Sequence, residues 1–91
     1  MDGNIEHDSN SHRFTTNVDG NTAHVEYERS GDVMTITHTI VPSEIGGRGV
    51  AGELVKAALD HARAEDLKVV PQCSYADGWM RKHPDYEELR A

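Results

Sequence analysis

The stretch that decides the fold is VMTITHTIVPSEIGGRGVAGELVKAALDHARAEDLKVVP, residues 33–71. Residues 33–41 are rich in β-branched side chains and predict a strand. A cluster of glycines follows, and from 48 to 65 the apolar residues recur at helical spacing. Residues 67–70 are short and apolar and end at Pro71, which predicts another strand. A strand, a helix and a strand in this order predict two parallel strands joined by a crossover.

Two further strands are predicted upstream of this stretch. Residues 13–18 and 22–29 are separated by a turn signal at 19–21, and apolar and polar side chains alternate in the second of them. A second turn signal leads into the strand at 33–41, so the three strands form an antiparallel meander. Residues 1–11 are polar and without pattern, and we expect them to be a disordered lead.

A second helix is predicted from Ser74 to Lys82. Ser74, with Asp77 three residues later, resembles an N-terminal cap, and Pro84 ends the helix. The first helix has one apolar stripe, made of Ala51, Leu54, Val55, Ala58 and Ala62. The sequence therefore predicts a single α+β domain over residues 12–91, with an antiparallel three-stranded meander, a parallel strand–helix–strand crossover and a C-terminal helix.

Composition narrows the classes of partner. The net charge of −7 disfavours nucleic acid, because such proteins gain affinity by neutralising phosphates. No apolar run approaches the roughly 20 residues of a membrane span, so no membrane partner is expected. The start MDGNIEHDSNSH lacks the pattern of a signal peptide. A single cysteine excludes an intramolecular disulfide and favours a reducing, cytosolic location.

Residues 45–52 read IGGRGVAG and lie between a predicted strand and a predicted helix. Glycines let the backbone approach a ligand, and a helix start offers unpaired N–H groups, so the pattern favours a phosphate or pyrophosphate site over a simple tight turn. Arg48 would add a charge-assisted contact.

Three known anion-binding or nucleic-acid-binding loops do not fit this cluster. A P-loop requires Lys followed by Ser or Thr, and Val50-Ala51 offers neither. A dinucleotide fingerprint requires an acidic residue at the end of the next strand, where Val70-Pro71 stands. The G-x-x-G loop of KH domains joins two helices, whereas a strand precedes the loop here.

An ordered set of motifs surrounds the glycine cluster. It consists of His38-Thr39-Ile40-Val41-Pro42, then Gly47-Arg48-Gly49, then Val70-Pro71-Gln72-Cys73, then Tyr75, Trp79 and His83-Pro84-Asp85-Tyr86. This set resembles the small single-domain proteins of the GNAT N-acetyltransferase family, and the resemblance covers residues 22–86. Glu44 departs from the Gln or Arg that opens the family's acetyl-CoA loop signature.

The resemblance implies an acetyl-CoA-dependent N-acetyltransferase. The donor's pyrophosphate would lie at the glycine loop and its pantetheine arm in a gap where both parallel strands end in Val-Pro, since proline cannot continue a strand ladder. A plainer interpretation is that these prolines only end the strands. The expected cofactor contacts are Ile40, Val41, Gly46, Gly47, Arg48, Gly49, Val50, Ala51, Ser74, Tyr75, Lys82 and His83. Tyr75 and Trp79 share one helix face, and aromatic residues in such a pattern belong to the core more often than to a ligand site, so we expect both to be core residues.

Two residues are candidates for the chemistry. Cys73 lies close to a helix start, which lowers a thiol pKa. It either accepts the acetyl group covalently, lines the site while an amine attacks directly, or is a small buried residue. His38 is the best base for the amine, although a hydrogen-bonded structural histidine fits its pattern nearly as well. The histidines lack metal-ligand spacing, so no metal is predicted.

The expected acceptor is an amine, on a small molecule or a protein. In larger members of the resembling family two helices between the first strands shape the acceptor site, and here only residues 19–21 join those strands. We therefore expect an open acceptor site. A CoA-binding or interaction module without efficient catalysis is the alternative from another functional class.

Overall fold

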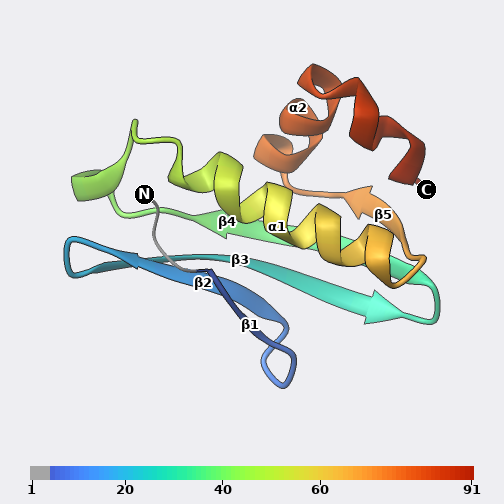
Figure 1. Cartoon of the computed structure of the whole chain (residues 1–91), viewed down its shortest axis with the longest axis horizontal. Coiled ribbons are helices and arrows are strands. Elements are labelled where there is room, and N and C mark those ends of the chain that lie inside the picture. The colour runs from blue at the N-terminus through green and yellow to red at the C-terminus, as the bar shows by residue number, and fades with distance from the viewer. Residues whose placement is uncertain (1–4) are drawn as a thin grey trace.

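The computed structural model describes residues 5–91 of the chain. Within them, strands pair in the order β1-β2-β3-β4-β5, antiparallel except for the parallel pair β4–β5 (Figure 1). The strands are β1 (Glu6–Asp8), β2 (Arg13–Val18), β3 (Asn21–Ser30), β4 (Val33–Ile40) and β5 (Lys68–Pro71). The predicted meander and parallel crossover are confirmed.

Left-handed backbone conformations close the two hairpins of the meander. Asp19 and Gly20 have φ of 52° and 81°, the conformation that a two-residue hairpin turn needs. Gly31, with φ of 58°, turns the chain from β3 into β4. These tight turns hold β2, β3 and β4 in one continuous antiparallel sheet.

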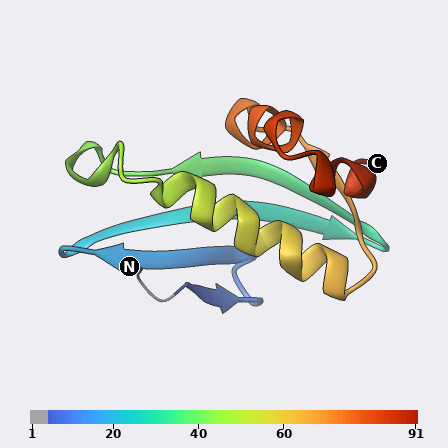
Figure 2. The ribbon, with the colours of Figure 1, turned by 45° about the horizontal axis from the view of Figure 1, so that its top comes forward.

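Two helices and two short 3-10 segments complete the described chain: η1 (Ser43–Ile45), α1 (Val50–Ala64), α2 (Ser74–Lys82) and η2 (Pro84–Leu89). Figure 2 shows α1 lying across the sheet, and α2 packs on α1, β4 and β5. The bounds of α2 are as predicted, but Cys73 and not Ser74 is the N-cap residue of the helix. The buried side chains of α1 are Val50, Leu54, Val55, Ala58, Leu59 and Ala62.

Only one side of the sheet is covered, and we call it the helix face. Val25 of β3 and Met34 of β4 are fully buried there, beneath α1. Side chains on the other side, the open face, are exposed or half-buried at every strand position from β2 to β5: Arg13, Thr15, Asn17, Thr22, His24, Glu26, Glu28, Ser30, Val33, Thr35, His38, Ile40, Lys68 and Val70. The described part of the chain places no helix on the open face.

A β-bulge in β4 changes which side chains reach each face. Tyr27 pairs with Ile36 but the preceding Glu26 pairs with His38, so Thr37 is an additional residue in β4. The Thr37 hydroxyl donates a hydrogen bond to the Glu26 carbonyl oxygen at 3.3 Å. Because one residue is inserted, the alternation reverses and His38 falls on the open face rather than on the helix face with Ile36.

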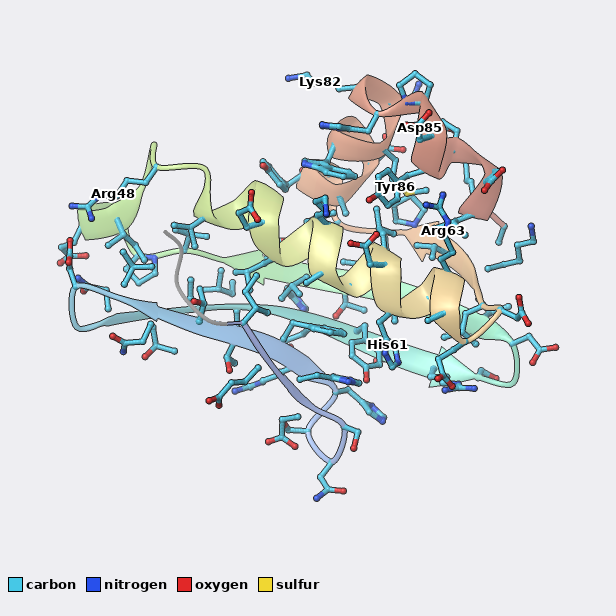
Figure 3. The ribbon with its side chains drawn as sticks, viewed as in Figure 1. Arg48, His61, Arg63, Lys82, Asp85 and Tyr86 are labelled. Carbon is cyan, nitrogen blue, oxygen red and sulfur yellow. The ribbon has the colours of Figure 1, made fainter. Side chains whose placement is uncertain are left out.

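Strand β1 corrects the prediction of a disordered lead over residues 1–11, of which residues 1–4 lie outside the described chain. Glu6–Asp8 pairs antiparallel with β2 as an edge strand. The ring of His7 stacks on Phe14 with centroids 4.2 Å apart, and its Nε2 lies 2.6 Å from the Tyr27 hydroxyl oxygen. His61, on the underside of α1 (Figure 3), lies edge-on to the His7 ring. These aromatic contacts had no signal in the periodicity of the sequence.

The C-terminal segment, residues 84–91, contacts both α1 and β5. Figure 3 shows Arg63 of α1 directed at Tyr86 and Asp85, and its guanidinium donates to the Asp85 carbonyl oxygen at 2.6 Å. Tyr86 donates its hydroxyl to Asp60 at 2.8 Å. The Ala91 N–H donates to the Val69 carbonyl at 2.8 Å, so the last residues occupy the outer edge of β5.

Candidate functional site

Half of the edge of β4 that faces β5 has no strand beside it. The parallel ladder pairs Val33 with Lys68 and ends where Ile36 pairs with Pro71. The chain then leaves the sheet, and the Cys73 N–H donates to the Ile36 carbonyl oxygen at 3.0 Å. From Thr37 to Ile40, β4 therefore offers a free edge to an extended ligand in the described structure.

The position of this gap differs from the expectation of two Val-Pro ends that splay side by side. Pro71 lies opposite Ile36, whereas Val41-Pro42 lies beyond the end of β4. Parallel pairing stops early because β5 is only four residues long. The expected contacts of the acyl arm, Ile40 and Val41, thus lie at the end of β4 that is farther from β5. Val41 packs partly against the core, and Ile40 is 47% exposed.

The glycine loop leads from β4 into α1 and leaves N–H groups unpaired at the helix start. Gly47 and Gly49 have φ of 81° and 78°, which favour glycine, and Gly49 is the cap residue of α1. The first helical hydrogen bond is donated by the Glu53 N–H to the Gly49 carbonyl at 3.1 Å. The preceding N–H groups of the helix, Val50 and Ala51 among them, therefore face outward, as an anion site requires.

Two residues of the loop region do something other than predicted. Arg48 pairs with the Asp19 carboxylate in the β2–β3 turn, at the outer end of the loop (Figure 3), so it does not face the helix start. Gly46 adopts an extended conformation and its N–H donates to the Ser43 carbonyl oxygen. The anion site that remains is made by backbone groups.

Gly52 serves the packing of helices. A Cβ at this position would lie 3.2 Å from Trp79 Nε1 and 3.3 Å from the Tyr75 hydroxyl. The absence of a side chain lets both aromatic residues of α2 approach α1 closely. Gly52 therefore fixes α2 beside the beginning of α1, next to the loop.

A shallow groove follows one side of α2, lined by Ser74, Tyr75, Gly78, Trp79, Lys82 and His83. Tyr75 is 43% exposed, which corrects the expectation that it is a core residue, while Trp79 packs partly against the core. The His83 ring stacks on Trp79 at 3.7 Å between centroids. Lys82 projects outward from the end of α2 (Figure 3). The four expected contacts on α2, Ser74, Tyr75, Lys82 and His83, thus share one groove.

Cys73 lies at the point where the free edge of β4 begins. Its Sγ is 3.4 Å from the Thr39 hydroxyl oxygen, on the helix face. Burial raises the pKa of the Cys73 thiol, but hydrogen bonds from the Thr39 hydroxyl and from the N–H groups of Ala76, Tyr75 and Thr39 outweigh burial, so the thiol pKa lies below its ordinary value. The thiol is therefore more reactive than an ordinary cysteine.

The structure does not place His38 beside Cys73. His38 lies on the open face, where its side chain is 64% exposed and its Nδ1 is 3.6 Å from Glu26 Oε1. The neighbouring residue in β4, Thr39, faces Cys73 from the other side. The two candidate catalytic side chains therefore stand on opposite sides of the same strand.

Comparison with known proteins agrees with this architecture. The profile of the GCN5-related N-acetyl-transferase family matches residues 13–89, which is most of the chain. The chain belongs to this family. The predicted GNAT family and α+β fold are thereby confirmed.

Relatives of this GNAT protein are found in animals and bacteria. Protein NATD1 of Gallus gallus and of Homo sapiens is each 37% identical over 83 residues, which cover 88% of this chain and 76% and 74% of those proteins. The solution structure of a GCN5-like protein from Staphylococcus aureus superposes with a TM-score of 0.77 at 30% identity and covers 100% of this chain and 91% of that one.

Within residues 5–91, no three His, Cys, Asp or Glu side chains are grouped so that they could hold a metal ion. No helix of the described chain has the length and apolar character needed to cross a membrane.

The sequence interpretation missed two groups of functional interest. Thr39 partners the Cys73 thiol, and Glu26 lies between His24 and His38 on the open face. Both contacts depend on the bulge at Thr37, after which the side chains of β4 alternate in the opposite sense between the two faces. No pattern in the sequence predicts this bulge. The one available signal was the alternation of His24, Glu26 and Glu28 with apolar residues in β3, which places all three on the open face.

Proposed function

We propose that this protein binds acetyl-CoA and transfers its acetyl group to an amine. The proposal rests on one observation. The Cys73 thiol lies where the free edge of β4 begins, and β4 leads through the glycine loop to the unpaired N–H groups at the start of α1. Together they suit a ligand with a thioester, an extended amide-containing arm and a pyrophosphate. Membership of the GNAT family supports the same donor.

Each region has its own part in binding. Backbone groups along residues 37–40 would hydrogen-bond the amides of the pantetheine arm, which would compete with the Cys73 thiol for the Thr39 N–H. The N–H groups of Val50 and Ala51, at the positive end of the helix dipole, would bind the pyrophosphate. Arg48 would take part only after leaving Asp19. The groove beside Tyr75 and Lys82 is open to the remainder of the donor.

Acetyl-CoA supplies an activated thioester, and we propose that the amine attacks it directly. The amine enters from the open face, whereas Cys73 lies on the helix face, so a covalent acetyl-cysteine would hold the acetyl group on the wrong side of β4. Cys73→Ala should therefore keep acetyl transfer within about tenfold of wild type. Mass spectrometry that finds an acetyl group on Cys73 as a turnover intermediate would contradict the direct route.

Calorimetric titration of acetyl-CoA tests the binding site, with two matched glycine variants. Gly49→Ala and Gly31→Ala each force a side chain into a positive φ with open space around it, so each should cost about 1 kcal/mol of folding free energy. Only Gly49 lies in the loop, so only Gly49→Ala should weaken acetyl-CoA binding, by about tenfold. Equal affinities in both variants, or no binding to wild type at millimolar ligand, would contradict the proposal.

The second candidate function is a CoA-binding or interaction module without efficient catalysis. It is favoured by the open face, where no described helix forms a wall around an acceptor. Binding of acetyl-CoA without acceleration of acetyl transfer to any amine would select this alternative. The cytosolic location remains a prediction that rests on the single cysteine.

A further inference from the structure

A cluster of charged side chains on the open face has no part in the donor site. Glu26 lies at its centre. Its Oε2 is 2.8 Å from His24 Nε2 and 3.2 Å from an Arg13 guanidinium nitrogen, and its Oε1 is 3.6 Å from His38 Nδ1. His24 is the most buried of the four, with 18% of its side chain exposed, and His38 the most exposed, with 64%.

The hydrogen bond from His24 lowers the pKa of Glu26, and Arg13 adds to this effect against a smaller opposing effect of burial, so Glu26 is an anion at neutral pH. A carboxylate beside Nδ1 of an imidazole favours the tautomer that carries its proton on Nδ1. With Nδ1 beside Glu26 and 64% of the His38 side chain exposed, Nε2 is accessible to a second molecule as a hydrogen-bond acceptor.

The bulge at Thr37 places this imidazole beside the free edge of β4. His38 is the first open-face residue after β5 has ended, and its neighbour Thr39 contacts Cys73 on the helix face. A group that lies along the free edge is therefore flanked by the thiol on one side and by the imidazole on the other. A second molecule can reach such a group only from the open face, since α1 and α2 cover the helix face.

We propose that the open face receives the acceptor as an alkylammonium ion, and that His38, positioned by Glu26, removes its proton. This inference rests on the proposed function. His38 Nε2 takes one proton from the ammonium group, the amine nitrogen forms a bond to the thioester carbonyl carbon, and the carbon–sulfur bond breaks. The second amine proton goes to the departing CoA thiolate, and His38 returns the first proton to solvent.

The chemistry of the surroundings favours an amine on an apolar stem, as in the side chain of lysine. Two of the exposed large apolar residues, Ile40 at 47% and Val70 at 39%, lie on the open face on either side of the gap. They would contact the methylene groups of the stem. Because the face is flat and has no described wall, the lysine would be presented by a peptide or protein rather than enclosed as a small molecule.

The test measures acetyl transfer to a probe, the methylamide of Nα-acetyl-lysine, by the wild type and three variants. His38→Gln removes the base and should lower kcat/KM by about 100-fold or more. Glu26→Gln should lower kcat about tenfold with little change in KM, because His38 loses the carboxylate that orients its imidazole while the surface that receives the acceptor remains. Glu28→Gln is the matched control, because Glu28 lies on the same strand and face, and it should leave transfer unchanged.

Acetyl-CoA binding, followed by calorimetry, separates this inference from the proposed function. All three variants should bind acetyl-CoA as the wild type does. Equal effects of Glu26→Gln and Glu28→Gln, an effect of Glu26→Gln on KM alone, or wild-type transfer to this lysine probe no faster than the uncatalysed reaction while acetyl-CoA binds would overturn the inference alone. Failure of the wild type to bind acetyl-CoA would overturn the proposed function itself.

Discussion

The two faces of the sheet differ most sharply along β4, where one strand serves both. Before the bulge, Ile36 is buried under the helices, and four residues later Ile40 is 47% exposed on the open face. The same inserted residue directs Thr39 to the Cys73 thiol and His38 to Glu26. A single additional residue thus separates a donor side, built on the helix face, from an acceptor side, built on the open face.

The largest expected effect compares these two isoleucines. Ile36→Ala leaves a cavity in a fully buried position and should lower the free energy of unfolding by about 2–5 kcal/mol. Ile40→Ala removes a half-exposed side chain and should cost less than about 1 kcal/mol. Denaturant titration of both variants measures the difference, and similar losses would show that β4 does not reverse its alternation at Thr37.

A smaller effect is expected at the Cys73 thiol. Thr39→Val removes the hydroxyl that lies 3.4 Å from Sγ, so the pKa of the thiol should rise and its alkylation by iodoacetamide near neutral pH should slow several-fold. Thr35→Val, on the same strand but on the open face, should leave the rate unchanged. If Thr39→Val leaves the alkylation rate unchanged, the Thr39 hydroxyl does not lower the pKa of the Cys73 thiol, and the contact between Cys73 and the free edge of β4 is contradicted.

The smallest expected effect concerns the stability of β1. Burial, followed by the neighbouring His61, lowers the pKa of His7, with Asp8 acting against this and His12 adding to it. The unfolded chain therefore binds more protons than the folded chain as the pH falls through the ordinary histidine value of about 6.5, and stability should decrease there. His7→Phe keeps the stacking on Phe14 and should flatten this pH dependence of the denaturation midpoint. An unchanged slope would assign the titration to another group.

Most of the helix face could be predicted from the sequence. The apolar stripe of α1, the parallel crossover and the extent of α2 follow from local periodicity, and the motifs around Cys73 indicate the donor side. These features are short-range, so residue spacing alone carries them. The structure changes only details, such as Tyr75 in a groove rather than in the core.

The open face, the edge strand β1 and the ion pair of Arg48 could not be predicted in the same way. The bulge at Thr37 is set by the register between β3 and β4, which no strand reveals by itself. Strand β1 forms because His7 meets Phe14, Tyr27 and His61 from three other elements. Arg48 turns to Asp19, a partner 29 residues away in sequence. Each case depends on contacts between distant residues.

The most direct test of the central claim is whether bound acetyl-CoA protects Cys73 from alkylation. Protection is expected if the donor lies along the free edge of β4, beside the Cys73 thiol. Acetyl-CoA should slow the reaction of Cys73 with iodoacetamide in proportion to the fraction of protein that is bound. Adenosine 3′,5′-diphosphate, which lacks the pantetheine arm, should leave the rate unchanged. An alkylation rate that is the same with and without saturating acetyl-CoA would contradict the account.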